Sequence, residues 1–129
     1  MLSRLRSDLT RLCLAALAGR LDSAQAEWDS RAALGVVLAA AGYPDTVRTG
    51  DVISGLEAAD ALPGKVFHAA TRTEHGGVIT SGGRVLCAVG LGATVGVAQR
   101  QAYTIAQVID WQGMQYRRDI GYRAIARER

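Results

Sequence analysis

The hydrophobic positions near the start of the chain recur at the spacing of an amphipathic helix. They are Leu9, Leu12, Cys13, Ala16 and Leu17. Ser7 and Asp8 precede them and offer an oxygen for the free amides of a first turn, with a carboxylate beside the positive end of the helix dipole. Gly19 offers an end nearby. The pattern therefore predicts a helix over residues 7–20, followed by a polar connection to residue 30.

The middle of the chain alternates apolar runs with turn residues. Residues 32–41 form a continuous apolar run, which favours a strand buried on both faces, and a Gly-Tyr-Pro sequence ends it. Residues 45–64 are typical of a loop, with a short helical turn near 57–61. Glycine-containing turns then separate three short strands, so we expect an antiparallel meander; the strands cover residues 65–71, 78–80 and 84–91.

A second helix is predicted from Thr94, as its cap, to about Asp110. One face carries Val95, Ala98, Ala102, Ile105 and Ile109. The last segment, residues 114–123, is short, basic and aromatic. This order of elements predicts a single α+β domain with a small antiparallel sheet and two main helices.

Composition and charge narrow the class of protein. The chain has 129 residues, 49% hydrophobic and 21% charged, which is typical of one globular domain. Its net charge of +3 comes from two basic ends around a slightly acidic middle, so the broad cationic face of a nucleic-acid binder is not expected. No apolar stretch approaches a membrane span, and the N-terminal pattern is amphipathic rather than that of a signal peptide. We therefore expect a cytoplasmic protein without membrane or nucleic-acid partners.

Few residues are candidates for chemistry carried out by this chain alone. His68 and His75 have no carboxylate or cysteine at metal-ligand spacing, so no metal site and no catalytic residue are expected. Gly90-Leu91-Gly92 precedes a helix as half of a phosphate loop would, but the third glycine and the lysine are missing. A strand end followed by a helix entry is the favoured interpretation.

The segment from Tyr116 to Gly121 is a stronger candidate. Arg117 and Arg118 could place two guanidinium groups on one dianionic phosphate. Asp119 could orient one of them, and Gly121 would let the chain turn close to a ligand. On spacing alone, a solvated basic tail explains these residues equally well.

Seven short motifs, in order along almost the whole chain, resemble the C-terminal domain of the phosphoribosylamine–glycine ligase family, which are ATP-grasp enzymes. They are Ser7-Asp8-Leu9 with Leu12; Glu27-Trp28-Asp29; Val36-Val37-Leu38-Ala39-Ala40 leading to Gly42-Tyr43-Pro44; Arg48-Thr49-Gly50-Asp51-Val52-Ile53; Lys65-Val66-Phe67-His68-Ala69; Gly82-Gly83-Arg84-Val85-Leu86; and Tyr116-Arg117-Arg118-Asp119-Ile120-Gly121.

The resemblance implies a function in purine biosynthesis. In that family, ATP activates glycine as an acyl phosphate, and the amine of phosphoribosylamine attacks it to give glycinamide ribonucleotide, ADP and phosphate. ATP and Mg²⁺ or Mn²⁺ belong to the full-length enzyme, and neither is expected on this chain alone. The chain is expected to be a fragment, inactive by itself, whose partner is the N-terminal and ATP-grasp portion. Residues 1–28 would be the last helix and linker of the ATP-grasp region, and residues 29–129 the C-terminal domain with its rudimentary hybrid motif.

The resemblance also implies a site for the ribose 5-phosphate. Arg117 and Arg118 would anchor the phosphate, with Asp119 as their orienter and Gly121 at the turn. Weaker candidates for the same ligand are Tyr43, Arg48 and Arg84, although a structural ion pair explains Arg84 as well.

The sequence departs from the family pattern at several positions, among them the helix start at residues 94–97, where glutamate is usual. Asp45 and Ala70 stand where glycine is usual, and Val47 stands where an aromatic residue is expected. A negative charge at Asp45 near a phosphate would weaken the case for Tyr43 and Arg48. The alternative function is a non-catalytic module that kept the fold and either binds phosphorylated ligands or self-associates through an exposed apolar face.

Overall fold

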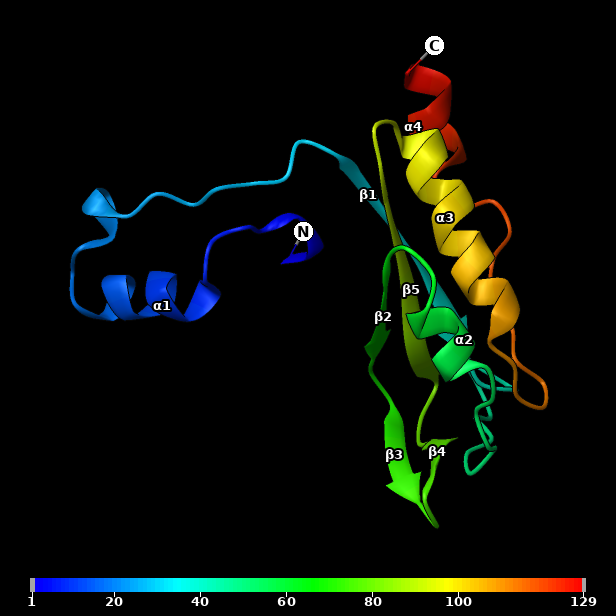
Figure 1. Ribbon diagram of the computed structural model, residues 1–129. Helices are drawn as coiled ribbons and strands as arrows, with labels where there is room; N and C mark the ends of the chain where they lie inside the picture. Colours follow the sequence, from blue (N-terminus) through cyan, green and yellow to red (C-terminus); the bar gives the residue numbers. More distant parts are fainter. Residues whose placement is uncertain (1, 129) are drawn as a thin grey trace.

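The computed structural model describes residues 2–128 and shows an α+β fold in which every strand pair is antiparallel (Figure 1). The elements, including two 3₁₀ turns (η), are η1 (Leu2–Arg4), α1 (Leu9–Leu17), η2 (Leu21–Ser23), β1 (Ala32–Ala39), α2 (Leu56–Asp60), β2 (Lys65–His68), β3 (Thr71–Glu74), β4 (Gly77–Thr80), β5 (Arg84–Gly92), α3 (Val95–Val108) and α4 (Tyr122–Arg127). The predicted fold class is confirmed.

The strands form two sheets rather than one meander. β5 lies between β1 and β2 in a three-stranded sheet, whereas β3 and β4 form a separate hairpin. The predicted strand over residues 65–71 breaks after His68, where Ala69 and Ala70 separate β2 from β3. The predicted turn at residues 81–83 therefore carries the chain from one sheet to the other. The meander prediction is wrong because β5 pairs with strands distant in sequence and not with β4.

Helix α3 covers only one face of the three-stranded sheet (Figure 1). Leu34, Val36 and Leu38 of β1 are buried, and the intervening Val37 is 42% exposed. Cys87 of the central strand β5 lies opposite Val37 of β1 on one side and opposite Phe67 of β2 on the other. Phe67 is 41% exposed. Residues directly opposite each other share a face, so these three side chains define the open face of the sheet. The expectation of a strand buried on both faces is wrong.

The contact between α3 and β5 depends on close backbone approach. A Cβ atom at Gly90 would lie 2.6 Å from the Ala102 nitrogen, and one at Gly92 would lie 2.7 Å from the Ala98 nitrogen. The buried face of α3 includes Ala98, Ala102 and Ile105, as predicted. The two glycines in the Gly-Leu-Gly pattern therefore permit helix–strand packing, which confirms the interpretation as a strand end and helix entry.

The start of α3 is capped twice. The Thr94 hydroxyl accepts a hydrogen bond from the Val97 amide at 3.2 Å, which confirms the predicted cap. The Glu128 carboxylate, after α4, accepts from the Val95 amide at 2.8 and 3.0 Å. Amides that a helix leaves unpaired at its first turn are thus satisfied by the chain itself.

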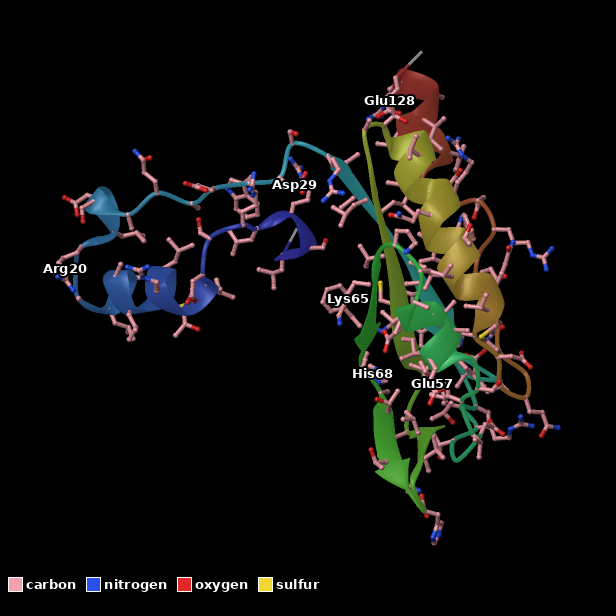
Figure 2. The ribbon with its side chains drawn as sticks, viewed as in Figure 1. Arg20, Asp29, Glu57, Lys65, His68 and Glu128 are labelled. Atoms are coloured by element: carbon pink, nitrogen blue, oxygen red, sulfur yellow. The ribbon has the colours of Figure 1, made fainter. Side chains whose placement is uncertain are left out.

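The N-terminal segment lies apart from the sheet and carries α1, whose side chains are all at least partly exposed (Figures 1 and 2). Asp8 caps α1 by accepting from the amides of Thr10 and Arg11 at 2.8 and 3.3 Å. Ser7 instead accepts from the Glu27 amide at 2.7 Å. Helix α1 therefore covers Leu9–Leu17 instead of the predicted residues 7–20. It contacts the neighbouring turn η2 and not the sheet (Figure 1).

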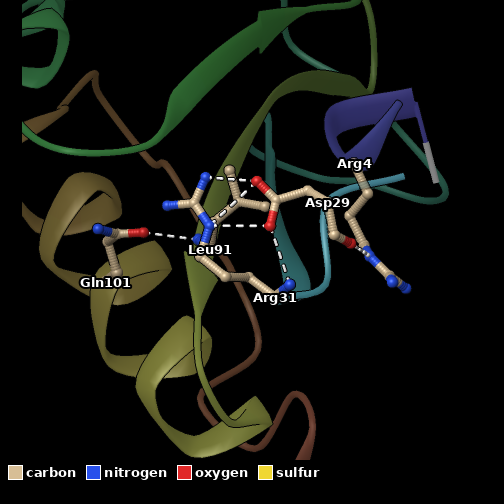
Figure 3. Close-up of polar contacts among 5 residues, drawn as sticks. All are labelled: Arg4, Asp29, Arg31, Leu91 and Gln101. Carbon is tan, nitrogen blue, oxygen red and sulfur yellow. Dashed lines mark hydrogen bonds and ion pairs between the residues drawn. The ribbon is translucent and has the colours of Figure 1, made fainter. Parts of the chain in front are cut away.

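The joint between this segment and β1 is fixed by polar contacts (Figure 3). Arg4 Nε donates to the Asp29 carbonyl at 3.0 Å. The Arg31 guanidinium donates to the Asp29 carboxylate at 2.6 and 3.0 Å, which holds the pKa of Asp29 well below its usual value. On the sheet side, Gln101 of α3 accepts from the Leu91 amide at 2.6 Å.

None of the helices in residues 2–128 is both long enough and apolar enough to span a bilayer.

Candidate functional site

A groove of about 420 Å³ lies where the end of β1 meets the C-terminal segment, and we call it the Arg84–Arg117 groove. Its lining consists of Val37, Ala39, Tyr43, Arg84, Gln115, Tyr116 and Arg117. A neighbouring hollow of about 640 Å³ shares Val37, Tyr43 and Arg84 with it and continues across Cys87 on the open face of the sheet. The structure thus brings together three of the predicted site residues, Tyr43, Arg84 and Arg117, from distant parts of the sequence.

Gln115 assembles this groove. Its amide and carbonyl pair with the carbonyl and amide of Ala39 at 3.0 and 2.8 Å, so the C-terminal segment extends the edge of β1. Its side-chain nitrogen donates to the carbonyls of Ala40 and Tyr43 at 3.1 and 3.0 Å. One amide side chain therefore fixes the loop that carries Tyr43 relative to the segment that carries Arg117.

The Tyr43 ring lies against the backbone of Gly83, where a Cβ atom would overlap the ring. Glycine at this position lets the ring approach the start of β5, directly before Arg84. Val47 and Ala70, two of the departures from the family pattern, line the neighbouring hollow. Asp45 is exposed in the turn, outside the lining of both the groove and the hollow, so its charge is not part of the groove wall.

Arg117 is paired with Asp119, as the sequence suggested. Nε donates to Oδ1 at 2.9 Å and Nη2 donates to Oδ2 at 2.6 Å. These hydrogen bonds lower the pKa of Asp119 and raise the pKa of Arg117. Since both side chains are exposed, the pair contributes orientation more than stability. A guanidinium has five N–H donors, so Arg117 keeps donors for a second anion.

The structure does not bring Arg117 and Arg118 together. Arg118 lines a different cavity, beside α3, and Arg117 does not reach it. The backbone on both sides of Arg118 is held by one hydroxyl: Tyr103 OH donates to the Arg117 carbonyl at 2.8 Å and accepts from the Ile120 amide at 3.1 Å. The segment is thus fixed with its two arginines in separate cavities.

The remaining predicted residues have structural contacts. Gly121 has φ +85° and precedes α4, and a Cβ atom there would overlap Leu34. Its left-handed conformation and its packing both require glycine. Arg48 donates to the Asp51 carboxylate at 3.0 Å and to the Gln112 carbonyl at 2.6 Å, so it ties two loops together outside the groove.

Arg84 has no ion-pair partner among residues 2–128 and lines both the groove and the hollow.

The sequence did not indicate the roles of Gln115 and Tyr103. Gln115 precedes the basic motif but matches no binding pattern, and Tyr103 has no signal because its partners are backbone atoms. In residues 2–128, no three His, Cys, Asp or Glu side chains gather as a group that could hold a metal ion.

Comparisons with known proteins place these features in context. The family model described as "Phosphoribosylglycinamide synthetase, C domain" matches residues 33–123. The phosphoribosylamine–glycine ligases of Vibrio cholerae and Allochromatium vinosum are 57% and 58% identical, over 99% and 100% of this chain. The chain spans about 30% of the length of each. A crystal structure of a phosphoribosylamine–glycine ligase from Thermotoga maritima matches with a TM-score of 0.65 and 35% identity, over 83% of this chain and 27% of that one.

Proposed function

Because the chain belongs to the phosphoribosylglycinamide synthetase C-domain family, we propose that it forms the C-terminal domain of a phosphoribosylamine–glycine ligase. That activity joins glycine to phosphoribosylamine at the expense of ATP, in purine biosynthesis in the cytoplasm. The chain supplies one wall of the substrate site and is inactive by itself. The rest of the ligase, including its ATP-grasp portion, is its partner.

ATP and Mg²⁺ or Mn²⁺ are assigned to that other portion. When bound there, the metal would neutralise the phosphate charge during formation of the acyl phosphate. We assign no metal ligand to this chain, and the carboxylates that hold the metal are proposed to lie in the ATP-grasp portion. No step of the reaction is therefore assigned to a metal held by this domain.

The Arg84–Arg117 groove is the proposed site for the 5-phosphate of the ribose. Arg117 would donate to the phosphate from an orientation held by Asp119, and Arg84 would donate from the start of β5. Tyr43, in the lining of the same groove, would add its phenolic hydroxyl. The observation that carries this proposal is the convergence of Tyr43, Arg84 and Arg117 on one groove from loops and strands far apart in sequence.

Residues 1–28 are proposed to pack with the ATP-grasp region. Two observations support this: no side chain of α1 is buried, and the family model begins at residue 33. The exposed large apolar side chains of this segment are Leu2, Leu9, Leu14, Leu17, Leu21 and Trp28. Burying them against the preceding region would remove a large apolar surface from water.

Two measurements test the site and the activity. Calorimetric titration of the 129-residue chain with ribose 5-phosphate should show binding that Arg117→Ala or Arg84→Ala weakens at least tenfold. Arg72→Ala, in the β3–β4 hairpin, is the matched control and should not change the affinity. Mixing the chain with the separately produced remainder of the ligase should restore product formation that depends on ATP and glycine. Unchanged affinity in both groove variants would refute the site, and no product from two folded pieces would refute the function.

A non-catalytic, self-associating module is the second candidate. The open face of the sheet favours it, because Val37 and Phe67 are both exposed there. Sedimentation velocity should then show a dimer that Val37→Asp dissociates, without any response to ribose 5-phosphate. A monomer at all concentrations would exclude this alternative.

A further inference from the structure

A second hollow of about 580 Å³ lies between α3 and the C-terminal segment, and we call it the α3 hollow. Its lining consists of Gln99, Arg100, Tyr103, Thr104, Gln107, Tyr116 and Arg118. Tyr116 is the one residue that it shares with the Arg84–Arg117 groove. The proposed function gives no ligand-binding role to the other six residues of this lining.

The walls of the α3 hollow are fixed by contacts to the backbone. Gln99 Nε2 donates to the Ile120 carbonyl at 2.7 Å, and the Tyr103 hydroxyl bonds to residues 117 and 120. The rings of Tyr103 and Tyr116 pack with their centroids 6.2 Å apart. A ligand would therefore meet a wall that is largely assembled, and the side chains of Gln107 and of the two arginines would have to be ordered on binding.

The charge of the lining has a single sign. Arg100 and Arg118 are its only charged residues, and among residues 2–128 neither forms an ion pair with a carboxylate. The two come from different elements, α3 and the C-terminal segment. The side-chain amide of Gln107 adds an uncharged donor to the same wall, whereas the Thr104 hydroxyl donates to the Arg100 carbonyl at 3.0 Å.

We propose that the α3 hollow binds a small, multiply charged oxyanion through Arg100 and Arg118, at a site separate from the Arg84–Arg117 groove. Two guanidinium groups on one concave wall, without a neighbouring carboxylate in the lining, favour an anion with several oxygen acceptors. Phosphate esters and polycarboxylates share this chemistry. The site does not depend on the ligase activity, because it uses different arginines from those proposed to hold the ribose phosphate.

Calorimetric titration of the 129-residue chain with pyrophosphate and, separately, with citrate tests the proposal at low ionic strength. Tighter binding of pyrophosphate would identify the ligand class as phosphate, and tighter binding of citrate as polycarboxylate. Arg100→Gln combined with Arg118→Gln should weaken the tighter probe at least tenfold, since charge-assisted hydrogen bonds are lost. Circular dichroism would establish that the double variant is folded.

The matched control is Arg84→Gln combined with Arg117→Gln, which removes two guanidinium groups from the groove and none from the α3 hollow. It should leave binding of the tighter probe unchanged while weakening ribose 5-phosphate. The proposal is overturned if neither probe binds at millimolar concentration, if Arg100→Gln with Arg118→Gln binds like the parent chain, or if only the control pair abolishes binding. These outcomes leave the proposed ribose-phosphate site standing, so the two proposals fail separately.

Discussion

Replacement of Tyr103 by phenylalanine removes one hydroxyl and keeps the ring. That hydroxyl makes two hydrogen bonds, to the Arg117 carbonyl at 2.8 Å and from the Ile120 amide at 3.1 Å. Each such bond contributes about 0.5–1.5 kcal/mol net. The ring and its contact with Tyr116 remain, so little apolar burial is lost. Tyr103→Phe should therefore lower the free energy of unfolding by about 1–3 kcal/mol.

Urea unfolding followed by tryptophan fluorescence measures this change. Trp111 is only 3% exposed and will report loss of the core, whereas Trp28, 45% exposed and outside the core, should change less. By calorimetry the melting temperature should fall by about 4 °C for each kcal/mol, for a domain of this size. Hydrogen exchange should locate the effect, because the Ile120 amide loses its acceptor and should exchange much faster.

Tyr122→Phe is the matched control. Its hydroxyl accepts from the exposed Arg123 Nε at 2.9 Å, so its removal should change stability by less than about 0.5 kcal/mol. Tyr103→Phe should also weaken ribose 5-phosphate binding, because the backbone carrying Arg117 is no longer held. Unaltered stability together with unaltered exchange at Ile120 would show that this hydroxyl does not fix the segment, and the argument for two separate cavities would fail.

Three further predictions concern the helix ends and the exposed ion pair. Gly121→Ala should lower the free energy of unfolding by about 2 kcal/mol or more in urea titrations, since it combines a strained φ of +85° with overlap of Leu34. Asp8→Ala should destabilise α1 alone by about 1 kcal/mol and so lower the helical signal in circular dichroism. The urea midpoint of the core, followed by Trp111 fluorescence, should not change. The pKa of Asp119 is lowered by Arg117, so the stabilisation from this pair is present above the ordinary carboxyl pKa and is lost only as the pH falls through the lowered value. Ribose 5-phosphate affinity measured between pH 5 and 8 should therefore follow the second ionisation of the phosphate, near about 6, in the parent chain and in Asp119→Asn alike.

Local patterns predicted local structure well. The apolar spacing and the threonine cap located α3, because both signals lie within the helix itself. The pairing of β1 with β5 could not be predicted, since it joins residues such as Val37 and Cys87 that are far apart in sequence. The glycines at 82 and 83 fit a hairpin turn equally well, although the chain uses them to pass between two sheets.

The one-sided burial of β1 was hidden because its open face is also apolar. Val37 stands between buried residues and is itself hydrophobic, so the expected alternation of polar and apolar positions is absent. The composition of the basic motif likewise did not reveal where its arginines point. That depends on the Tyr103 hydroxyl, whose contact with the backbone leaves no pattern in the sequence.

The start of α3 shows how a short glycine motif can mislead when it is taken as a sign of nucleotide binding. Two glycines ahead of a helix suggest a loop that cradles a nucleotide, yet here the first amide of that helix is already taken by an acid 33 residues downstream. Trimming the chain before Glu128 would uncover that amide without creating a nucleotide loop, because the glycines are needed to let a helix backbone touch a strand. In this family member, the two glycines keep the surface of β5 free of side chains where the backbone of α3 touches it.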